Sequence, residues 1–276
     1  MVTAKTKINI IIGDPVEHSI SPQLHNLAYQ HHKLDKDFIY LACRVKKTQL
    51  KQAIAGAKAL GINGITCTIP HKVNVIKYLD KIDKTAKQIG AVNTILNKNG
   101  KLIGYNTDWY GIEAPLKKRI TLKDKTAAVL GAGGAARAVC YALAKNKIKI
   151  TVFNRTLEKA KQLASDFKAE YKSINEKHLL KSYDIVINAT PVGMYPNIKD
   201  SLLTPKDIAK DQIIFDIVYT PYETQLLKNA KKAEAKIIYG FEMLLYQAIL
   251  QFKIYTNQTP DEDFLRTQLY KLLKIK

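Results

Sequence analysis

The chain has 276 residues, of which 46% are hydrophobic and 25% charged, a length that allows two domains and a composition that excludes disordered and fibrous classes. The formal net charge is +20, but only five of the 44 basic residues are arginine, the side chain that reads phosphates and guanines bidentately, so we expect no nucleic-acid partner. The chain has no apolar stretch long enough to span a bilayer, its N-terminus resembles a strand and not a signal peptide, and its three cysteines lack CxxC spacing, so a cytoplasmic protein without a membrane partner is expected.

Short runs rich in Ile and Val alternate along the chain with longer amphipathic runs rich in Lys and Ala. This alternation predicts an α/β fold with a parallel sheet. In chain order the predicted elements are strand 8–12, helix 22–32, strand 38–43, helix 48–60, strand 64–69, helix 72–79, strand 92–96, helix 109–118, strand 127–130, helix 134–145, strand 148–153, helix 157–167, strands 185–188 and 213–217, helix 223–234, strand 237–239, and helices 241–255 and 262–273.

The segment TAAVLGAGGAARAVCYALAK (126–145) carries a GxGxxA dinucleotide fingerprint between a predicted strand and a predicted helix. Gly131 permits a tight turn, Gly133 allows the backbone to approach a pyrophosphate, and the helix from Gly134 offers its free N–H groups to the phosphates. The alternative is a glycine-rich turn without a ligand. The residues expected to bind the dinucleotide are Gly131, Ala132, Gly133, Gly134 and Ala135.

The next predicted strand ends in Asn154, Arg155 and Thr156, where an NAD-specific fold places a carboxylate for the ribose 2′-hydroxyl. The Arg155 guanidinium can form two hydrogen bonds with a 2′-phosphate, and Lys159, one helical turn further, adds a second cation. NADP is therefore predicted in preference to NAD. The alternative is that Arg155 and Thr156 only begin a helix, with Thr156 as its N-cap.

The nucleotide motif places a domain boundary near Asp108, since no linker, repeat or low-complexity segment marks one. The last two predicted helices follow the second half without an intervening strand, so they are expected to pack back onto the first. We therefore predict an αβ substrate-binding domain of residues 1–107 plus 241–276 and a doubly wound Rossmann-type domain of residues 108–240, with a cleft between them.

The segment GDPVEHSISPQLHN (13–26) places Ser19 and Ser21 two residues apart. If the segment is extended, both hydroxyls point the same way and can bind one carboxylate. Pro22 suits the first position of a helix, so such an anion would also lie near a helix N-terminus. The alternative is that Ser21 caps that helix.

Polar side chains follow several predicted strands: Thr68 and Lys72 in NGITCTIPHK, Asn93 in GAVNT, and Asp108 in GYNTDWYG. Each has an ordinary interpretation, such as a surface lysine, a turn residue or a helix N-cap. Together they form a lysine, a carboxylate and neutral hydrogen-bonding groups at strand ends, where open α/β sheets bind ligands.

The ordered motifs HSISP, TIPHK, GAVNT, NTDWYG, GAGGAARA, NRT, NATPVGM, DIVYTP and GFEMLLYQA resemble those of the shikimate dehydrogenase family over essentially the whole chain. The chain departs from the family pattern at Thr66, where an Asn is usual, and at Gln225, where a Pro is expected after Thr224. Neither departure removes a proposed catalytic group, but Thr66 could alter substrate selectivity.

The resemblance implies reduction of 3-dehydroshikimate to shikimate by NADPH in the biosynthesis of aromatic amino acids. It implies that Lys72 and Asp108 form the catalytic pair, because hydride addition leaves negative charge on an oxygen that must be protonated or stabilised. By position, the other implied substrate-binding residues are Ser19, Ser21, Thr68, Asn93, Tyr219 and Gln247. On the nicotinamide side the resemblance implies Thr190, Met194 and Gly240. Without the resemblance, Gln247 could be an exposed polar residue.

Two rival functions stay open at the level of sequence: a quinate/shikimate dehydrogenase that uses NAD, and a non-catalytic NADP-binding regulator. Paired serines and Arg155 favour the NADP-dependent shikimate enzyme, while Lys72 and Asp108 argue against lost catalysis. His18, His25, His31 and His32 lie close in sequence, but no cysteine or carboxylate completes a plausible set, so no metal is expected. The expected partner is a small-molecule substrate, and the protein is expected to be a monomer or a homodimer.

Overall fold

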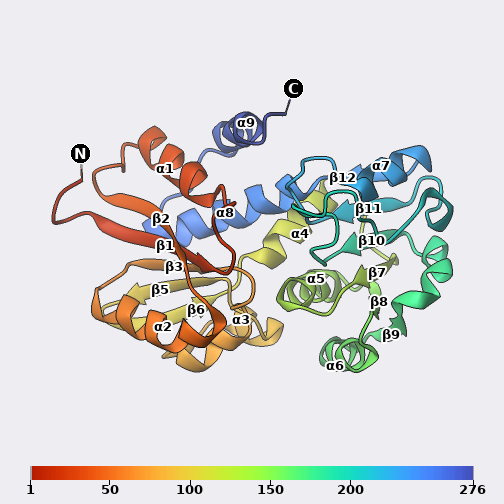
Figure 1. Cartoon of the computed structure of the whole chain (residues 1–276), viewed down its shortest axis with the longest axis horizontal. Coiled ribbons are helices and arrows are strands. Elements are labelled where there is room, and N and C mark those ends of the chain that lie inside the picture. Colours follow the sequence, from red (N-terminus) through yellow and green to blue (C-terminus); the bar gives the residue numbers. More distant parts are fainter. Residues whose placement is uncertain (1, 276) are drawn as a thin grey trace. The chain divides into compact units, whose positions relative to one another are not determined.

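The computed structural model describes residues 2–275, whose contacts divide the chain into two compact units. One unit runs to Thr107 and includes the chain from Gln247 onward, and the other is Asp108–Tyr246. The chain therefore returns to the first unit in the middle of a helix, at Gln247, and not at the start of that helix. Figure 1 labels the elements of both units, which are described separately below. No helix among residues 2–275 has the length and apolar character needed to cross a membrane.

The first unit is built on a six-stranded mixed sheet with the order β2-β1-β3-β5-β6-β4. Strands β1, β2 and β3 are mutually parallel, whereas β5 runs antiparallel to β3 and forms a hairpin with β6. The strands are β1 Lys7–Gly13, β2 Phe38–Arg44, β3 Gly64–Cys67, β4 Lys81–Ile82, β5 Thr94–Lys98 and β6 Lys101–Tyr105. The helices are α1 Ser21–His31, α2 Leu50–Ala59, α3 Lys84–Ile89, the C-terminal part of α8 Gly240–Thr256, and α9 Glu262–Leu272, with 3-10 turns at Lys47–Gln49 and Asn74–Tyr78.

Helices cover both faces of this sheet (Figure 1). On one face, Ile54 of α2 and Ala86 of α3 pack with Ile10 and Ile65 of the central strands. On the other face the contacts are largely aromatic, between Tyr29 of α1 and Phe252 of α8 among others. The carboxyl ends of the central strands lie at one edge of the sheet, between the two helical layers. The polar residues of the candidate site were predicted to follow these strand ends.

The second unit contains a six-stranded parallel sheet with the order β9-β8-β7-β10-β11-β12. This is the 3-2-1-4-5-6 order of a doubly wound Rossmann fold, with its switch point between β7 and β10. The strands are β7 Thr126–Leu130, β8 Lys149–Asn154, β9 Glu170–Ser173, β10 Ile185–Asn188, β11 Ile213–Asp216 and β12 Lys236–Ile238. The helices are α4 Asp108–Lys117, α5 Gly134–Lys145, α6 Leu157–Phe167, α7 Gln225–Lys232 and the start of α8, with 3-10 segments at Ile174–Ser182 and Pro205–Asp207.

Alternate residues of β7 show how this sheet is buried on both faces. Ala127 and Val129 pack with α4, α5 and α6 on one side. Ala128 and Leu130 pack with α7 and the 3-10 segments on the other. The predicted α/β class with a Rossmann-type unit is confirmed, but the first sheet is mixed where a parallel sheet was expected.

Several predicted elements differ from the structure. The helix expected at 72–79 is a 3-10 turn, Asn74–Tyr78, and β5 begins at Thr94 instead of residue 92. Strands β4, β6 and β9 and helix α3 were not predicted. The β5–β6 hairpin turns at Asn99 and Gly100, both with positive φ, which is the Asn-Gly signal of a tight hairpin. Strand β9 is polar and lies at the sheet edge, so no apolar alternation marks it.

Candidate active site

The glycine-rich turn follows β7 at the switch point of the Rossmann sheet. Gly131 has φ +109°, and a Cβ there would lie 2.8 Å from Thr190 Cγ2, so both the conformation and the packing require glycine. Helix α5 begins after Gly133, which has no side chain to cap it, and a Cβ on Gly133 would meet no atom within 4 Å. The first turn of α5 therefore presents backbone N–H groups beside open space, an arrangement that fits a pyrophosphate.

The end of β8 carries the residues predicted to select NADP. Asn154 donates a hydrogen bond from Nδ2 to the carbonyl oxygen of Thr156 at 2.8 Å, which shapes the turn into α6. Arg155, Thr156 and Lys159 are exposed. Thr156 occupies the N-cap position, as the alternative interpretation required, but its side chain makes no capping hydrogen bond. The structure thus assigns no capping role to the Thr156 hydroxyl.

The carboxyl ends of β10 and β11 form a buried polar network that the sequence analysis did not identify. Asn188 Oδ1 accepts hydrogen bonds from Thr190 N at 3.1 Å and Thr190 Oγ1 at 2.7 Å. Asn188 Nδ2 donates to Asp216 Oδ1 at 2.9 Å. Asp216 also accepts from Val218 N at 3.1 Å and from Thr224 Oγ1 at 2.6 Å. Burial raises the pKa of Asp216 to about 6, although these three hydrogen bonds act in the opposite direction.

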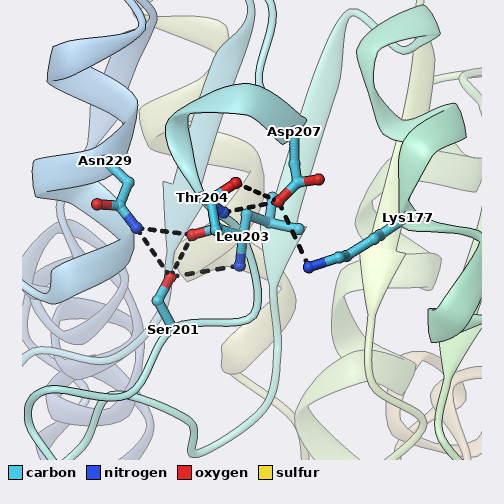
Figure 2. Close-up of polar contacts among 6 residues, drawn as sticks. All are labelled: Lys177, Ser201, Leu203, Thr204, Asp207 and Asn229. Atoms are coloured by element: carbon cyan, nitrogen blue, oxygen red, sulfur yellow. Dashed lines mark hydrogen bonds and ion pairs between the residues drawn. The ribbon is translucent and has the colours of Figure 1, made fainter.

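Hydrogen bonds join the segment around Ser201 and Leu203, which follows Met194 in the chain, to Asn229 of α7 (Figure 2). Asn229 Nδ2 donates to the carbonyl oxygen of Leu203 at 2.7 Å, and Ser201 Oγ donates to the same oxygen at 2.7 Å. Gln225 Nε2 donates to Asn229 Oδ1 at 2.9 Å, so the residue that replaces the expected proline orients this anchor. Met194 itself is 37% exposed at the surface of the unit.

Two further predicted residues lie near the end of β11. Tyr219 is partly buried. Gly240 begins α8, and a Cβ there would collide with the carbonyl oxygen of Val218. This packing alone explains why position 240 is glycine, whether or not it also contacts a cofactor.

In the first unit, backbone hydrogen bonds gather Thr68, Lys72 and Asn93 at one edge of the sheet. Thr68 N donates to the carbonyl oxygen of Ile12 at 3.0 Å, and the Thr68 methyl group fills the space where Gly13 lacks a side chain. Val92 N donates to the carbonyl oxygen of Lys72 at 2.7 Å, which places the lysine beside Asn93. The backbone that follows β3 and the backbone that precedes antiparallel β5 are thus adjacent, and Lys72 is partly buried.

The Asn93 side chain is fixed by a buried network. Its Oδ1 accepts from Thr107 N at 2.7 Å and from Thr94 Oγ1 at 2.8 Å, while Nδ2 donates to Thr107 Oγ1 at 2.9 Å. Gln251 Nε2 of α8 donates to Thr94 Oγ1 at 3.0 Å. Asn93 is therefore no ordinary turn residue, and Gln251 is a member of the site that the sequence analysis missed.

Asp108 and Gln247 are both buried, at 3% and 7% exposed. Asp108 is the first residue of α4. The alternative that Gln247 is an exposed polar residue is wrong.

The expectation that Ser19 and Ser21 lie in an extended stretch is wrong. Ile20, between them, has helical φ and ψ of −87° and 0° and serves as the N-cap of α1, so Ser21 is already helical. The alternative that Ser21 caps the helix is wrong for the same reason. Instead Ser21 N donates to Ser19 Oγ at 3.3 Å. This turn holds the Ser19 hydroxyl at the N-terminus of α1, and Ser21 is buried.

Thr66, the departure from the family pattern, lies in a cluster of buried tyrosines. Its Oγ1 accepts from Tyr40 OH at 2.5 Å and is 2.9 Å from Tyr255 OH. His25 stacks on Tyr40, with ring centroids 4.5 Å apart. Burial lowers the pKa of His25 to about 4, against the opposing effect of Gln251. The Thr66 hydroxyl is thus used to bind the two tyrosines.

Among residues 2–275, no group of three His, Cys, Asp or Glu side chains is arranged to hold a metal ion. His31 and His32 both reach Asp261 at the start of α9: His31 Nε2 lies 3.4 Å from Asp261 Oδ2, and His32 Nε2 accepts from Asp261 N at 3.2 Å. These contacts explain two of the clustered histidines as part of the α1–α9 packing.

Together these features define the class: a two-unit α/β protein with a Rossmann-type nucleotide-binding unit and a mixed-sheet unit that carries a lysine and amide groups at strand ends. Three sequence models of protein families match the chain. They are the shikimate dehydrogenase substrate binding domain over residues 11–95, shikimate / quinate 5-dehydrogenase over 114–221, and the shikimate 5′-dehydrogenase C-terminal domain over 240–270.

Similar proteins match over nearly the full length. The shikimate dehydrogenase (NADP(+)) of Methanocaldococcus jannaschii is 46% identical over 279 residues, which cover 98% of each chain. A crystal structure of a shikimate dehydrogenase in complex with NADP+ has a TM-score of 0.92 at 44% identity, covering 99% of this chain and 98% of its own. That of the Thermus thermophilus enzyme in complex with NADP(H) and shikimate has a TM-score of 0.88 at 31% identity, covering 96% and 99%. The chain belongs to the shikimate dehydrogenase family.

Proposed function

We propose that the protein catalyses the reversible, NADP-dependent interconversion of shikimate and 3-dehydroshikimate. The observation that carries the proposal is the hydrogen bond from Val92 N to the carbonyl oxygen of Lys72, which brings the main chain of the candidate proton donor next to that of Asn93, whose side-chain amide is fixed. Membership of the family over nearly the whole chain supports the substrate, and relatives with the same named activity support NADP.

Lys72 and Asp108 are the proposed catalytic pair. Bound NADPH supplies a hydride to the ketone carbon. Lys72 Nζ donates a hydrogen bond to the ketone oxygen as it gains negative charge and transfers a proton to it; in the reverse direction it accepts the hydroxyl proton. Asp108 orients the ammonium and hydrogen-bonds a substrate hydroxyl. The partial burial of Lys72 and the near-complete burial of Asp108 support roles in a site with limited access for water.

The substrate carboxylate is assigned to Ser19, Ser21 and Tyr219, and the ring and its hydroxyls to Thr68, Asn93 and Gln247. The turn at the N-terminus of α1 supports the serine pair, since it brings Ser21 N within hydrogen-bonding distance of Ser19 Oγ and places both at a helix N-terminus. The fixed orientation of the Asn93 amide supports selective recognition of a hydroxyl.

The cofactor is assigned to the second unit. The turn of Gly131 to Ala135 would hold the pyrophosphate, and Arg155 with Lys159 would bind the 2′-phosphate beside Asn154 and Thr156. Thr190, Met194 and Gly240 would contribute to the nicotinamide side. The lack of a carboxylate at the end of β8 supports NADP over NAD.

In this proposal the unit that ends at Thr107 and resumes at Gln247 binds the substrate, and the other unit binds NADP. The partners are small molecules, and the protein acts as a monomer or a homodimer in the cytoplasm. The free thiols of Cys43, Cys67 and Cys140 support a reducing compartment.

The test is the initial rate of NADPH formation by the purified protein with the four combinations of shikimate or quinate and NADP+ or NAD+. We expect shikimate with NADP+ to give the highest kcat/KM. A higher kcat/KM for quinate with NAD+ would replace the proposal with its closest rival. Binding of NADP+ without turnover of either substrate would support a regulator instead.

A further inference from the structure

We propose that Asp216 is a positioning residue that, through Asn188, holds Thr190 against the phosphate-binding turn at Gly131. The inference rests on the proposed cofactor site and deepens it, because Asp216 and Asn188 lie behind the residues assigned to NADP. The relay runs within the second unit, from the carboxyl end of β11 through that of β10 to the turn that follows β7.

The first step is the orientation of the Asn188 amide. Asn188 is 1% exposed and Asp216 is fully buried, so neither side chain can exchange its partners for solvent. An ionised carboxylate only accepts hydrogen bonds, and Asp216 Oδ1 is 2.9 Å from Asn188 Nδ2. This contact leaves Asn188 Oδ1 facing Thr190. If the amide were reversed, its oxygen would face the carboxylate and its N–H groups would face donors.

The second step is the position of Thr190. Its backbone N and its Oγ1 both donate to Asn188 Oδ1, and Oγ1 in turn accepts from Val192 N at 3.2 Å. With the hydroxyl held in this way, the Thr190 methyl group is directed at Gly131, where it occupies the space of the missing Cβ. Loss of the relay would free Thr190 to rotate and would loosen the surface on which the nucleotide turn rests.

Asp216 also has a partner that is not part of the relay. Its Oδ2 accepts from Thr224 Oγ1, and Thr224 caps α7 by accepting from Leu227 N at 3.3 Å. Thr224→Val therefore disturbs the same carboxylate and lowers stability without breaking the contact between Asp216 and Asn188. This variant separates loss of stability from loss of positioning.

The experiment measures the Kd of NADPH by fluorescence, together with Tm and the shikimate KM, for three variants. Asp216→Leu has no acceptor for Asn188, and we expect the Kd of NADPH to rise about tenfold or more. Asp216→Asn keeps an oxygen that can accept from Asn188, while Thr224 can reverse its hydroxyl, so the Kd should stay within about threefold of the unsubstituted protein. Thr224→Val should lower Tm with the Kd nearly unchanged.

An equal rise in Kd for Asp216→Leu and Thr224→Val would overturn the proposal, because positioning would then be inseparable from stability. If Asp216→Leu does not fold, Asn188→Leu provides the second test, since it removes the acceptor of both Thr190 hydrogen bonds at a residue that is not assigned to NADP. A Kd for Asn188→Leu equal to that of the unsubstituted protein would show that the relay positions nothing, whereas a weakened Kd supports it. Because the deciding readout is the Kd of NADPH, the outcome is independent of whether shikimate is the substrate.

Discussion

Lys72 lies in the turn that follows β3. The hydrogen bond from Val92 N to its carbonyl oxygen fixes its main chain, and the residue is partly buried. We expect Lys72→Ala to lower kcat by about 10² to 10⁴ with little change in the KM of shikimate, because the lost interaction strengthens as charge develops on the ketone oxygen. Steady-state rates for Lys72→Ala and for the exposed Lys87→Ala as control test this. A raised KM at unchanged kcat would instead make Lys72 a binding residue.

Arg155 is exposed at the end of β8, where a 2′-phosphate would lie. Arg155→Gln should raise the KM of NADP+ by about 10- to 100-fold, since a charge-assisted hydrogen bond is lost, and should leave the KM of NAD+ nearly unchanged. Lys161→Gln, which removes an exposed cation from α6, the helix that follows Arg155, is the matched control. Equal effects of the two substitutions on NADP+ would reduce the role of Arg155 to general electrostatic attraction.

At the scale of elements, α8 contributes to the first unit through Gln251, which is fully buried and donates to Thr94 next to Asn93. Gln251→Met should raise the KM of shikimate about 2- to 10-fold, because Thr94 loses a partner that helps to orient Asn93. The effect on the free energy of unfolding should be small. Gln251 Oε1 is buried without a hydrogen-bond partner, and methionine removes the cost of burying this unpaired acceptor. Substrate kinetics with thermal unfolding test this, and an unchanged KM would contradict it. The exposed Lys253→Met serves as control.

Helices α5 and α6 and strand β10 begin and end where the sequence predicted. Their signals are local: a glycine start, an amphipathic period, or three consecutive buried apolar residues between polar breakers. Strand β9 carries no such signal because it is polar and at an edge, and β6 was missed although Asn99-Gly100 marked its hairpin. The segment after Lys72 was predicted as a helix but forms only a 3-10 turn, in agreement with the low helix propensity of the Val-Asn-Val-Ile run at 73–76.

The residues of the candidate site also fall into those that a local sequence signal predicts and those that only the fold brings together. The nucleotide turn is contiguous in sequence, so its residues could be named directly. The partners that orient Asn93 come from distant segments, with Gln251 157 residues from Thr94 along the chain, and no pattern in one sequence joins them. The relay from Asp216 to Asn188 spans 28 residues and depends on the order of the strands. Motifs therefore predicted the groups assigned to ligands, and only the fold revealed the groups that orient them.

At the scale of the whole molecule, each unit buries a titratable group whose pKa is shifted, and the two shifts have opposite consequences. For His25 the pKa falls from 6.5 to about 4, so its contribution to stability is complete above pH 6.5 and is lost as the pH falls through 4. For Asp216 the pKa rises from 3.8 to about 6, so its contribution is complete below pH 3.8 and is lost as the pH rises through 6. Each shift corresponds to on the order of 3 kcal/mol.

The two contributions offset each other between pH 4 and pH 6 in the intact chain, so single substitutions are needed to separate them. We expect the stability of the unsubstituted protein relative to His25→Phe, which can keep the stacking on Tyr40, to decrease on acidification from pH 7 to pH 4. Relative to Asp216→Asn it should increase over the same range. Denaturant unfolding at several pH values measures both differences, and a common sign for the two would contradict the assignment of opposite shifts to these two buried groups.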